Sequence, residues 1–138
     1  MRGTTRTSGR LRMIEAAGAE AVIGDPDRVA TIAGSLERVT LVCVLLGSAA
    51  GSWEQISALH GPRLEMLLTR MLDSTVRGVV YEAAGSVDRE VLRAGAERVS
   101  RFCERSMIPH AILAADPADH GLWLPAAVEA VERVIATR

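Results

Sequence analysis

The histidines, serines and cysteines of this chain could all do chemistry, but their spacing matches none of the common catalytic or metal sites. His60, His110 and His120 lack metal-ligand spacing, and the two nearest of them are separated by a predicted strand and turn. No serine stands in a Gly-x-Ser-x-Gly motif, so a hydrolase of the nucleophile-elbow type has no nucleophile here. Cys43 and Cys103 are isolated, which is typical of reduced, buried thiols.

The charges exclude two classes of partner. The chain has 16 basic and 17 acidic residues, a formal net charge of -1, and every basic residue is arginine. We therefore expect no nucleic-acid partner and no lysine chemistry. The longest apolar stretch, 39–47, is much shorter than the roughly 20 residues of a spanning helix, so we expect no membrane partner either. Together with reduced thiols, this indicates a cytoplasmic protein.

Short β-branched segments alternate with stretches of helical period, a pattern that predicts a parallel sheet with helices on both faces. The chain of 138 residues is long enough for one domain with one core. The strands are short and apolar, and we expect them to be buried on both faces. They are expected at 20–24, 40–46, 78–83 and 110–114, with a shortened fifth at 2–5.

Capping residues mark the ends of the expected helices. Ser8, Asp27, Ser52 and Asp88 are the predicted N-caps, and Gly18 is expected to end the first helix in a left-handed turn. The inward-facing residues are expected to be Leu11, Ile14 and Ala17; Val29, Ile32 and Leu36; Ile56, Leu64, Leu67 and Met71; Leu92, Ala96, Val99 and Cys103; and Leu124, Val128, Val131 and Ile135. Gly61-Pro62 is expected to kink the longest helix, and Pro125 to lie in the first turn of the last.

Two segments resemble a known family. Residues 2–6 (Arg-Gly-Thr-Thr-Arg) and 14–25 (Ile-Glu-Ala-Ala-Gly-Ala-Glu-Ala-Val-Ile-Gly-Asp) resemble atypical short-chain dehydrogenase/reductase proteins related to sugar-nucleotide epimerases, from their second strand onward. The resemblance implies a three-layer, Rossmann-like α/β domain over residues 1–138. Its parallel sheet would have four or five strands, and the first strand of the family would be missing.

The resemblance also implies cofactor-binding positions. In such proteins an arginine after the second strand meets the 2′-phosphate of NADP, and a Gly-Asp pair ending the third strand lies beside adenine; Arg6 and Gly24-Asp25 are the matching residues. Leu46 and Gly47 would end the fourth strand near the ribose. The implied cofactor is NADP or NAD. Arg6 favours a phosphorylated ribose.

Two of these positions have a second interpretation. Residues 47–52, which include Ser48, join a strand to a helix and could offer backbone amides to an anion, or they could form a plain turn. Asp25 precedes Pro26 at a strand end, where ligands gather in open α/β sheets, but it could equally cap a helix.

The glycine-rich start of the family has no counterpart. Its members open with a strand, a Gly-x-x-Gly-x-x-Gly turn and a helix that receives the pyrophosphate, whereas the glycines here do not form that fingerprint. We therefore expect an N-terminally shortened form. In the usual strand order, 3-2-1-4-5-6, the first strand is central, so its loss separates the two halves of the sheet. Exposed inner edges would favour a homodimer or aggregation.

The catalytic pair of the family is absent too. Its enzymes use Tyr-x-x-x-Lys, but the only tyrosine, Tyr81, is followed four residues later by Gly85, and we expect Tyr81 to pack within a strand. The sequence thus predicts a relative of NAD(P)-dependent epimerases and reductases without tyrosine-lysine catalysis and with weak or lost dinucleotide binding. Whether it is an enzyme stays open. The alternative is a non-enzymatic module for self-association or for a protein partner.

Overall fold

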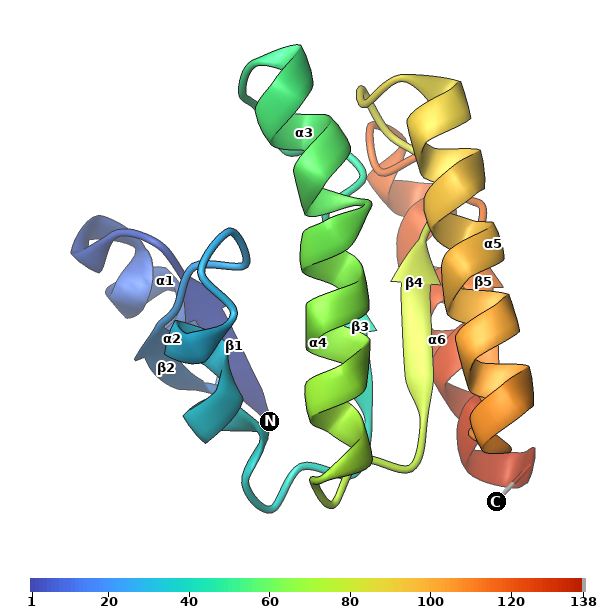
Figure 1. Cartoon of the computed structure of the whole chain (residues 1–138). Helices are drawn as coiled ribbons and strands as arrows, with labels where there is room; N and C mark the ends of the chain where they lie inside the picture. Colours follow the sequence, from blue (N-terminus) through green and yellow to red (C-terminus); the bar gives the residue numbers. More distant parts are fainter. Residues whose placement is uncertain (138) are drawn as a thin grey trace.

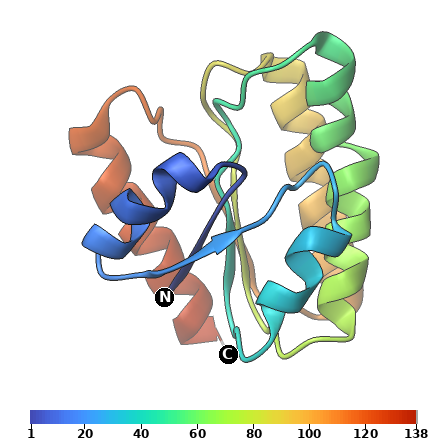
Figure 2. The ribbon, with the colours of Figure 1, turned by 90° about the vertical axis from the view of Figure 1, so that its left-hand side faces the viewer.

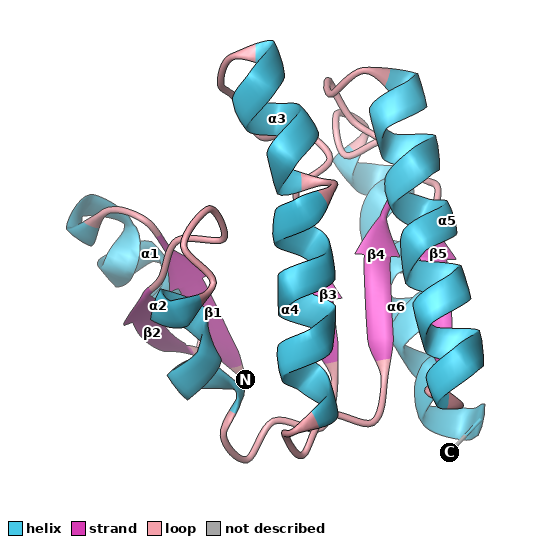
Figure 3. Ribbon diagram, viewed as in Figure 1, coloured by secondary structure: helices cyan, strands magenta, loops and turns pink. Residues whose placement is uncertain are grey.

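The computed structural model describes residues 1–137 and contains two parallel sheets. In the smaller sheet β1 (Arg2–Thr5) pairs with β2 (Glu20–Ile23). The larger sheet has the order β3 (Val42–Val44), β4 (Val79–Glu82), β5 (His110–Leu113). Figure 3 shows the strands across the molecule in the order β2, β1, β3, β4, β5. The predicted α/β class and all five predicted strands are confirmed, but they form two sheets instead of one continuous sheet.

Helices cover both sides of the sheets, as predicted. Figure 2 shows α1 and α6 on one side and the other helices on the opposite side. The helices are α1 (Leu11–Ala16), α2 (Ala30–Ala33), α3 (Trp53–Leu59), α4 (Pro62–Leu72), α5 (Arg89–Ser106) and α6 (His120–Thr137), with 3-10 turns at Ser8–Arg10 and Gly34–Leu36. The arrangement in Figure 1 is therefore three-layered.

The division between the sheets falls between β1 and β3. A central strand normally occupies this place in the order 3-2-1-4-5-6, and without one the two halves have no ladder between them. The smaller sheet is instead tied to the segment that leads into β3, because Nη1 of Arg2 donates to the carbonyls of Ser35 at 2.8 Å and Glu37 at 2.9 Å.

Two apolar clusters stabilise the fold, one on each side of the larger sheet. The first joins α2, α4 and α5 to the sheet and includes Val44, Leu68 and Tyr81. The second packs α6 on β4 and β5 through Val80, Ala111, Leu113, Ala130 and Val134. The inward positions predicted for α2 to α5 are confirmed: they are buried or half-buried.

The predicted burial of every strand on both faces is correct only for β4, whose four residues are all buried. On β3, Val44 is buried and Cys43 is exposed, and Leu45, directly after the strand, is exposed too. The prediction of a buried Cys43 was therefore wrong, because β3 is an edge strand of the larger sheet; Cys103 is buried, as expected.

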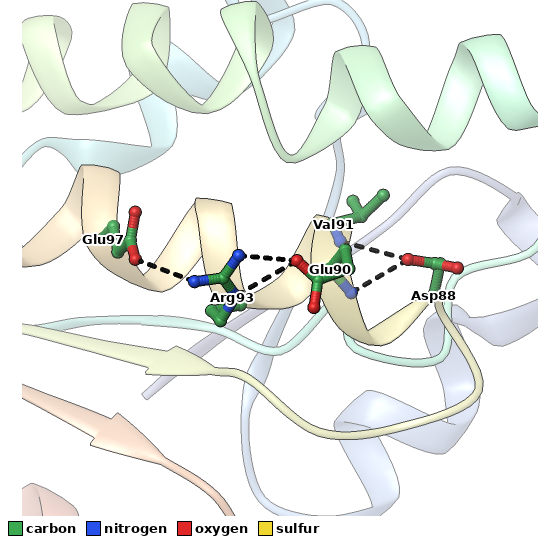
Figure 4. Close-up of polar contacts among 5 residues, drawn as sticks. All are labelled: Asp88, Glu90, Val91, Arg93 and Glu97. Atoms are coloured by element: carbon green, nitrogen blue, oxygen red, sulfur yellow. Dashed lines mark hydrogen bonds and ion pairs between the residues drawn. The ribbon is translucent and has the colours of Figure 1, made fainter.

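The caps of α3 and α5 are as predicted. Ser52 forms a capping box with Gln55, and Asp88 accepts hydrogen bonds from the amides of Glu90 at 2.9 Å and Val91 at 3.4 Å. Figure 4 also shows Arg93 between two glutamates of α5. The N-terminal end of a helix carries a partial positive charge. Carboxylates in the first turn and the capping aspartate therefore both stabilise the helix.

The other predicted caps were wrong. Ser8 lies inside a 3-10 turn, and Asp27 precedes a short helix whose N-cap is Val29, with no side-chain bond. Gly18 does end α1 with a φ of 88°, as predicted. Gly61-Pro62 does more than kink one helix, because it separates α3 from α4, with Pro62 at the start of the second.

The last helix begins earlier than predicted, and a different face of it packs on the sheet. It starts at His120, so that Pro125 lies inside it, not in its first turn. Small residues at 126, 127 and 130 face the sheet, together with Val134, which packs against the bare backbone of Gly78. Because small residues permit closer packing than the larger apolar ones, the predicted inward residues Leu124, Val128 and Ile135 are left exposed.

Candidate functional site

Three loops converge at the carboxyl edge of the larger sheet. They follow β3, β4 and β5, and they border an open hollow with a volume of about 480 Å³. Its lining consists of Ser48, Gly85, Ser86, Asp116, Pro117 and Ala118. In open α/β sheets ligands bind at this edge.

Close contact between two glycines holds the first two loops together. A side chain on Gly47 would collide with the carbonyl of Ala84, and one on Gly85 would collide with the carbonyl of Gly47. Gly85 also has a φ of 142°, which L side chains rarely adopt. The amide of Val87 donates to the Gly47 carbonyl at 3.0 Å. Backbone packing therefore requires glycine at both positions.

The Ser48 hydroxyl takes part in the same contact. It accepts a hydrogen bond from the amide of Ser86 at 3.2 Å, while Ser48 itself stays exposed beside the hollow. An oxygen that accepts one bond still has a proton to donate. Ser48 can thus donate to a ligand without breaking the contact between the loops.

Glu82 lies beneath the loops and is only 3% exposed. Its Oε1 accepts from the amide of Gly47 at 2.9 Å, and its Oε2 accepts from Nε1 of Trp123 at 2.7 Å. A buried carboxylate needs such donors to offset its desolvation. Glu82 therefore connects the loop after β3 to α6.

Three of the six amides of the loop 47–52 donate within the chain. Gly47 donates to Glu82, Ala49 donates to the carbonyl of Leu46 at 3.3 Å, and Ser52 donates to the side chain of Gln55 at 2.9 Å. A phosphate-binding loop needs amides that point at the ligand. This loop can therefore offer a ligand the Ser48 side chain and its remaining three amides, but not the whole set.

The remaining predicted residues lie on the smaller sheet. Arg6 follows β1 and is exposed, whereas Gly24 follows β2 and is buried. The pairing of Thr5 with Ile23 places Arg6 and Gly24 at the same carboxyl edge. Among residues 1–137, no hydrogen bond joins these residues to Leu46, Gly47 or Ser48.

Asp25 organises the loop after β2. Its Oδ1 accepts from the amide of Asp27 at 3.0 Å, and its own amide donates to the hydroxyl of Thr31 at 2.8 Å. The side chain closes a local turn instead of capping α2, as short polar side chains often do.

Sequence reasoning missed most of the hollow. Asp116, in a segment to which no chemistry had been assigned, lines it and accepts from the amide of Ala118 at 2.9 Å. Gly24 and Gly47 came from the family resemblance; the rule that ligands gather where parallel strands end would also have pointed to the loops that carry Gly85 and Asp116. Glu82 carried no such signal, because it lies within a strand.

Tyr81 and His60 are buried on the other face of β4. The Tyr81 side chain is 0% exposed, as expected for a residue packed within a strand. Its hydroxyl lies 2.6 Å from Nδ1 of His60, whose Nε2 lies 3.0 Å from the carbonyl of Leu46. Because a carbonyl only accepts, Nε2 carries the proton and Tyr81 donates to Nδ1.

Burial decides the ionisation of this pair. It lowers the pKa of His60, which the bond to Leu46 opposes, and it raises the pKa of Tyr81 above its ordinary value. Both groups are therefore neutral near pH 7.

Two further features bear on the kind of site. Within residues 1–137, no group of three histidine, cysteine or acidic side chains is placed to hold a metal ion. No helix in that part of the chain combines the length and apolarity needed to cross a bilayer.

Comparisons with known proteins place the fold. Neither the protein families nor the curated proteins compared with the sequence match it. Among solved structures, triphenylmethane reductase of Citrobacter sp., complexed with NADP(H), has a TM-score of 0.61 and 14% identity over 81% of this chain. A nucleoside-diphosphate-sugar epimerase of Staphylococcus aureus has a TM-score of 0.57 and 14% identity over 80% of this chain.

The matches cover only part of those proteins. This chain spans 38% of the reductase and 39% of the epimerase. Similarity at this identity is similarity of fold. The chain thus has a Rossmann-like α/β fold that it shares with a reductase and a sugar-nucleotide epimerase.

Proposed function

We propose that this chain has the scaffold of a nucleotide-binding protein and is related to NAD(P)-dependent reductases and epimerases. Its dinucleotide binding is weak or lost. The observation that carries the proposal is the convergence of the loops after β3, β4 and β5 on one hollow at the carboxyl edge. The fold shared with a reductase that binds NADP(H) supports it.

Six residues are the proposed cofactor contacts. Arg6, Gly24 and Asp25 would contribute from the smaller sheet, and Leu46, Gly47 and Ser48 from the larger. An arginine is suited to the 2′-phosphate of NADP, because its guanidinium matches phosphate geometry. We therefore expect NADP to bind better than NAD.

Weak binding follows from two features of the chain. The sequence has no Gly-x-x-Gly-x-x-Gly turn to bring a helix N-terminus to the pyrophosphate. The amides of Gly47 and Ser52, which could replace it, already donate to Glu82 and Gln55. The side chains of Arg6 and Ser48, with the remaining amides of the loop 47–52, would have to supply the recognition.

Tyrosine-lysine catalysis is not part of the proposal. The chain has no lysine, and the Tyr81 hydroxyl is buried and donates to His60. A phenol with a raised pKa in the core has no route to a substrate at the strand edge.

Thermal unfolding with millimolar NADPH or NADH tests the proposal, because a ligand that binds only the folded state raises Tm. We expect a small rise that is larger with NADPH. The difference between the two nucleotides should disappear in Arg6→Ala and persist in Arg12→Ala, which removes a charge from α1. Equal rises in wild type and Arg6→Ala would contradict the role of Arg6, and nanomolar affinity would contradict weak binding.

A second candidate is a non-enzymatic interaction module that self-associates or binds a protein. It is favoured by the unpaired inner edges of β1 and β3 and by the exposed apolar residues near them. Light scattering at increasing concentration tests self-association, for which we expect a homodimer. A monodisperse monomer at all concentrations would contradict it.

The cellular setting is part of the same proposal. Near-balanced charge favours neither nucleic acid nor an anionic membrane surface, and the two free thiols suit a reducing cytoplasm.

A further inference from the structure

We infer that His60 and Glu82 are positioning residues for the ligand site. They hold the peptide group between Leu46 and Gly47, called here the 46–47 peptide, from opposite faces of the sheet. They thereby fix the place of the Ser48 hydroxyl beside the hollow. The inference rests on the proposed function and adds a proton-linked control to the site that this function uses. Within residues 1–137 neither of the two side chains lines the hollow itself.

Both polar groups of the 46–47 peptide are bonded to buried side chains. The carbonyl of Leu46 accepts from Nε2 of His60 at 3.0 Å, and the amide of Gly47 donates to Oε1 of Glu82 at 2.9 Å. His60 is 1% exposed and Glu82 is 3% exposed. The C=O and N–H of a planar trans peptide point in opposite directions, so the two side chains hold it from two sides.

The two bonds come from different layers of the fold. Tyr81 and Glu82 are consecutive residues of β4, and their side chains point to opposite faces of the sheet. Tyr81 lies in the cluster with α4 and α5, where its hydroxyl donates to Nδ1 of His60 at 2.6 Å. Glu82 accepts from Nε1 of Trp123 in α6 at 2.7 Å. Figure 2 shows α6 on one side of the sheet and α3 to α5 on the other.

The 46–47 peptide leads directly into the hollow. Ser48 is the next residue, and its hydroxyl accepts from the amide of Ser86 at 3.2 Å at the border of the hollow. The carbonyl of Gly47 accepts from the amide of Val87 at 3.0 Å. A tilt of the 46–47 peptide would therefore disturb both contacts with the loop after β4. Because a binding group must be held within about 0.5 Å of its productive position, such a tilt would weaken a ligand's bond to Ser48.

His60 makes this arrangement depend on pH. The neutral imidazole accepts from Tyr81 and donates to Leu46, whereas an imidazolium has donors only. Its formation would leave the Tyr81 hydroxyl without the acceptor that it has among residues 1–137. Burial lowers the pKa of His60, and the bond to Leu46 opposes this effect. The arrangement is therefore complete above about pH 6.5 and is lost as the pH falls toward the folded pKa.

The charged groups near this pair come from three elements. Burial raises the pKa of Tyr81, while the charge of Arg98 in α5 lowers it and that of Glu82 in β4 raises it. Glu65 of α4 pairs with Arg98 at 3.2 Å. β3 has no charged residue, and Glu54 of α3 lies in the first turn, at the opposite end of that helix from His60. Glu65 thus balances the one cation on this side of the sheet, and burial is left as the main influence on His60.

Amide exchange followed by NMR tests the positioning. The amide of Val87 bonds to the carbonyl of Gly47 and reports on the loop. The amide of Val79 bonds to the carbonyl of Pro109 at 3.1 Å and reports on the sheet as a whole. The quantity to compare is the protection factor of Val87 divided by that of Val79. A change in overall stability alone leaves this ratio constant.

Four variants separate positioning from stability. His60→Leu and Glu82→Met each remove one bond to the 46–47 peptide and should lower the ratio about tenfold. Tyr81→Phe and Trp123→Phe are the matched controls, because each removes the other bond of the same side chain. These two should destabilise the fold but keep the ratio close to that of wild type. Circular dichroism shows that each variant is folded.

A pH profile provides a readout that a merely packed histidine would not move. Between pH 7.5 and 5.5 the ratio should fall in wild type. His60→Gln should keep the wild-type ratio of pH 7.5 throughout, because its amide can donate to the carbonyl of Leu46 and does not titrate.

Binding of NADP, measured as the rise in Tm, connects the loop to the ligand. The rise should shrink in His60→Leu and Glu82→Met and persist in Tyr81→Phe and Trp123→Phe. An equal ratio of protection factors in wild type and all four variants would overturn the inference. So would an unchanged NADP response in variants whose ratio has fallen. If wild type shows no response to NADP, the proposed function fails, and the ratio still decides whether His60 and Glu82 hold the loop.

Discussion

The hydroxyl of Tyr81 donates a hydrogen bond to Nδ1 of His60 across 2.6 Å in the core. The bond joins β4 to the end of α3, while Nε2 of His60 donates to the carbonyl of Leu46 after β3. One buried imidazole thus satisfies polar groups from two segments.

Removing the Tyr81 hydroxyl should destabilise the fold. Tyr81→Phe leaves Nδ1 of His60 buried without a donor, which typically costs about 1–3 kcal/mol. Urea denaturation measures the change in the free energy of unfolding. Thr69→Ala, which removes an exposed hydroxyl on α4, is the control and should change it by about 0.5 kcal/mol at most. Equal effects of the two changes would show that the buried bond contributes nothing.

His60 should make stability fall in mild acid. Its pKa in the folded state lies below the ordinary value of 6.5, so the unfolded state binds more protons as the pH decreases. The contribution of His60 is therefore fully present above about pH 6.5 and is lost as the pH falls toward the folded pKa, by at most about 1.4 kcal/mol per pH unit.

Denaturation between pH 7.5 and 5 measures this dependence in wild type and in His60→Gln. The difference between their slopes isolates His60 from the other titrating groups. Equal slopes of the free energy of unfolding against pH in the two proteins would mean that His60 has the same pKa in the folded and unfolded states.

Gly95 should not tolerate a methyl group. It lies in the middle of α5, where Gly→Ala ordinarily stabilises a helix by about 1 kcal/mol. A Cβ at this position would collide with the Tyr81 hydroxyl, so Gly95→Ala should instead destabilise by about 1–3 kcal/mol.

The matched change is Gly34→Ala. Gly34 has helical backbone angles and no atom within 4 Å of an added Cβ, so this variant should be neutral or more stable. Melting temperatures of the two variants decide the point. A stabilised Gly95→Ala would mean that Tyr81 can move aside.

Glu82 should be irreplaceable as a double acceptor. In Glu82→Gln one carboxylate oxygen becomes an NH₂ group, which faces either the Gly47 amide or the Trp123 indole as a second donor. We expect a loss of about 1–3 kcal/mol and a changed emission of Trp123. Fluorescence is measured in a Trp53→Phe background, since Trp53 is the only other tryptophan and is exposed. The exposed Glu129→Gln is the control, and an effect of similar size there would refute the prediction.

The sequence by itself determined the elements. β-Branched segments gave all five strands, and side-chain chemistry gave the caps at Ser52 and Asp88 and the left-handed end at Gly18. These features depend on residues that are close along the chain, so local patterns are enough to predict them.

Only the tertiary structure decided which apolar faces are covered. The sequence placed Leu124 and Val128 of α6 inward, but the small residues of that helix pack on the sheet because they allow closer contact. Cys43 looked like a core residue and is exposed, since β3 lies at the edge of the larger sheet.

The contacts of Glu82 with Gly47 and Trp123, and of Tyr81 with His60, were likewise beyond local reasoning. Each joins residues more than twenty positions apart. Their partners become neighbours only when parallel strands align and helices cross them, and no periodicity in a single segment encodes that meeting.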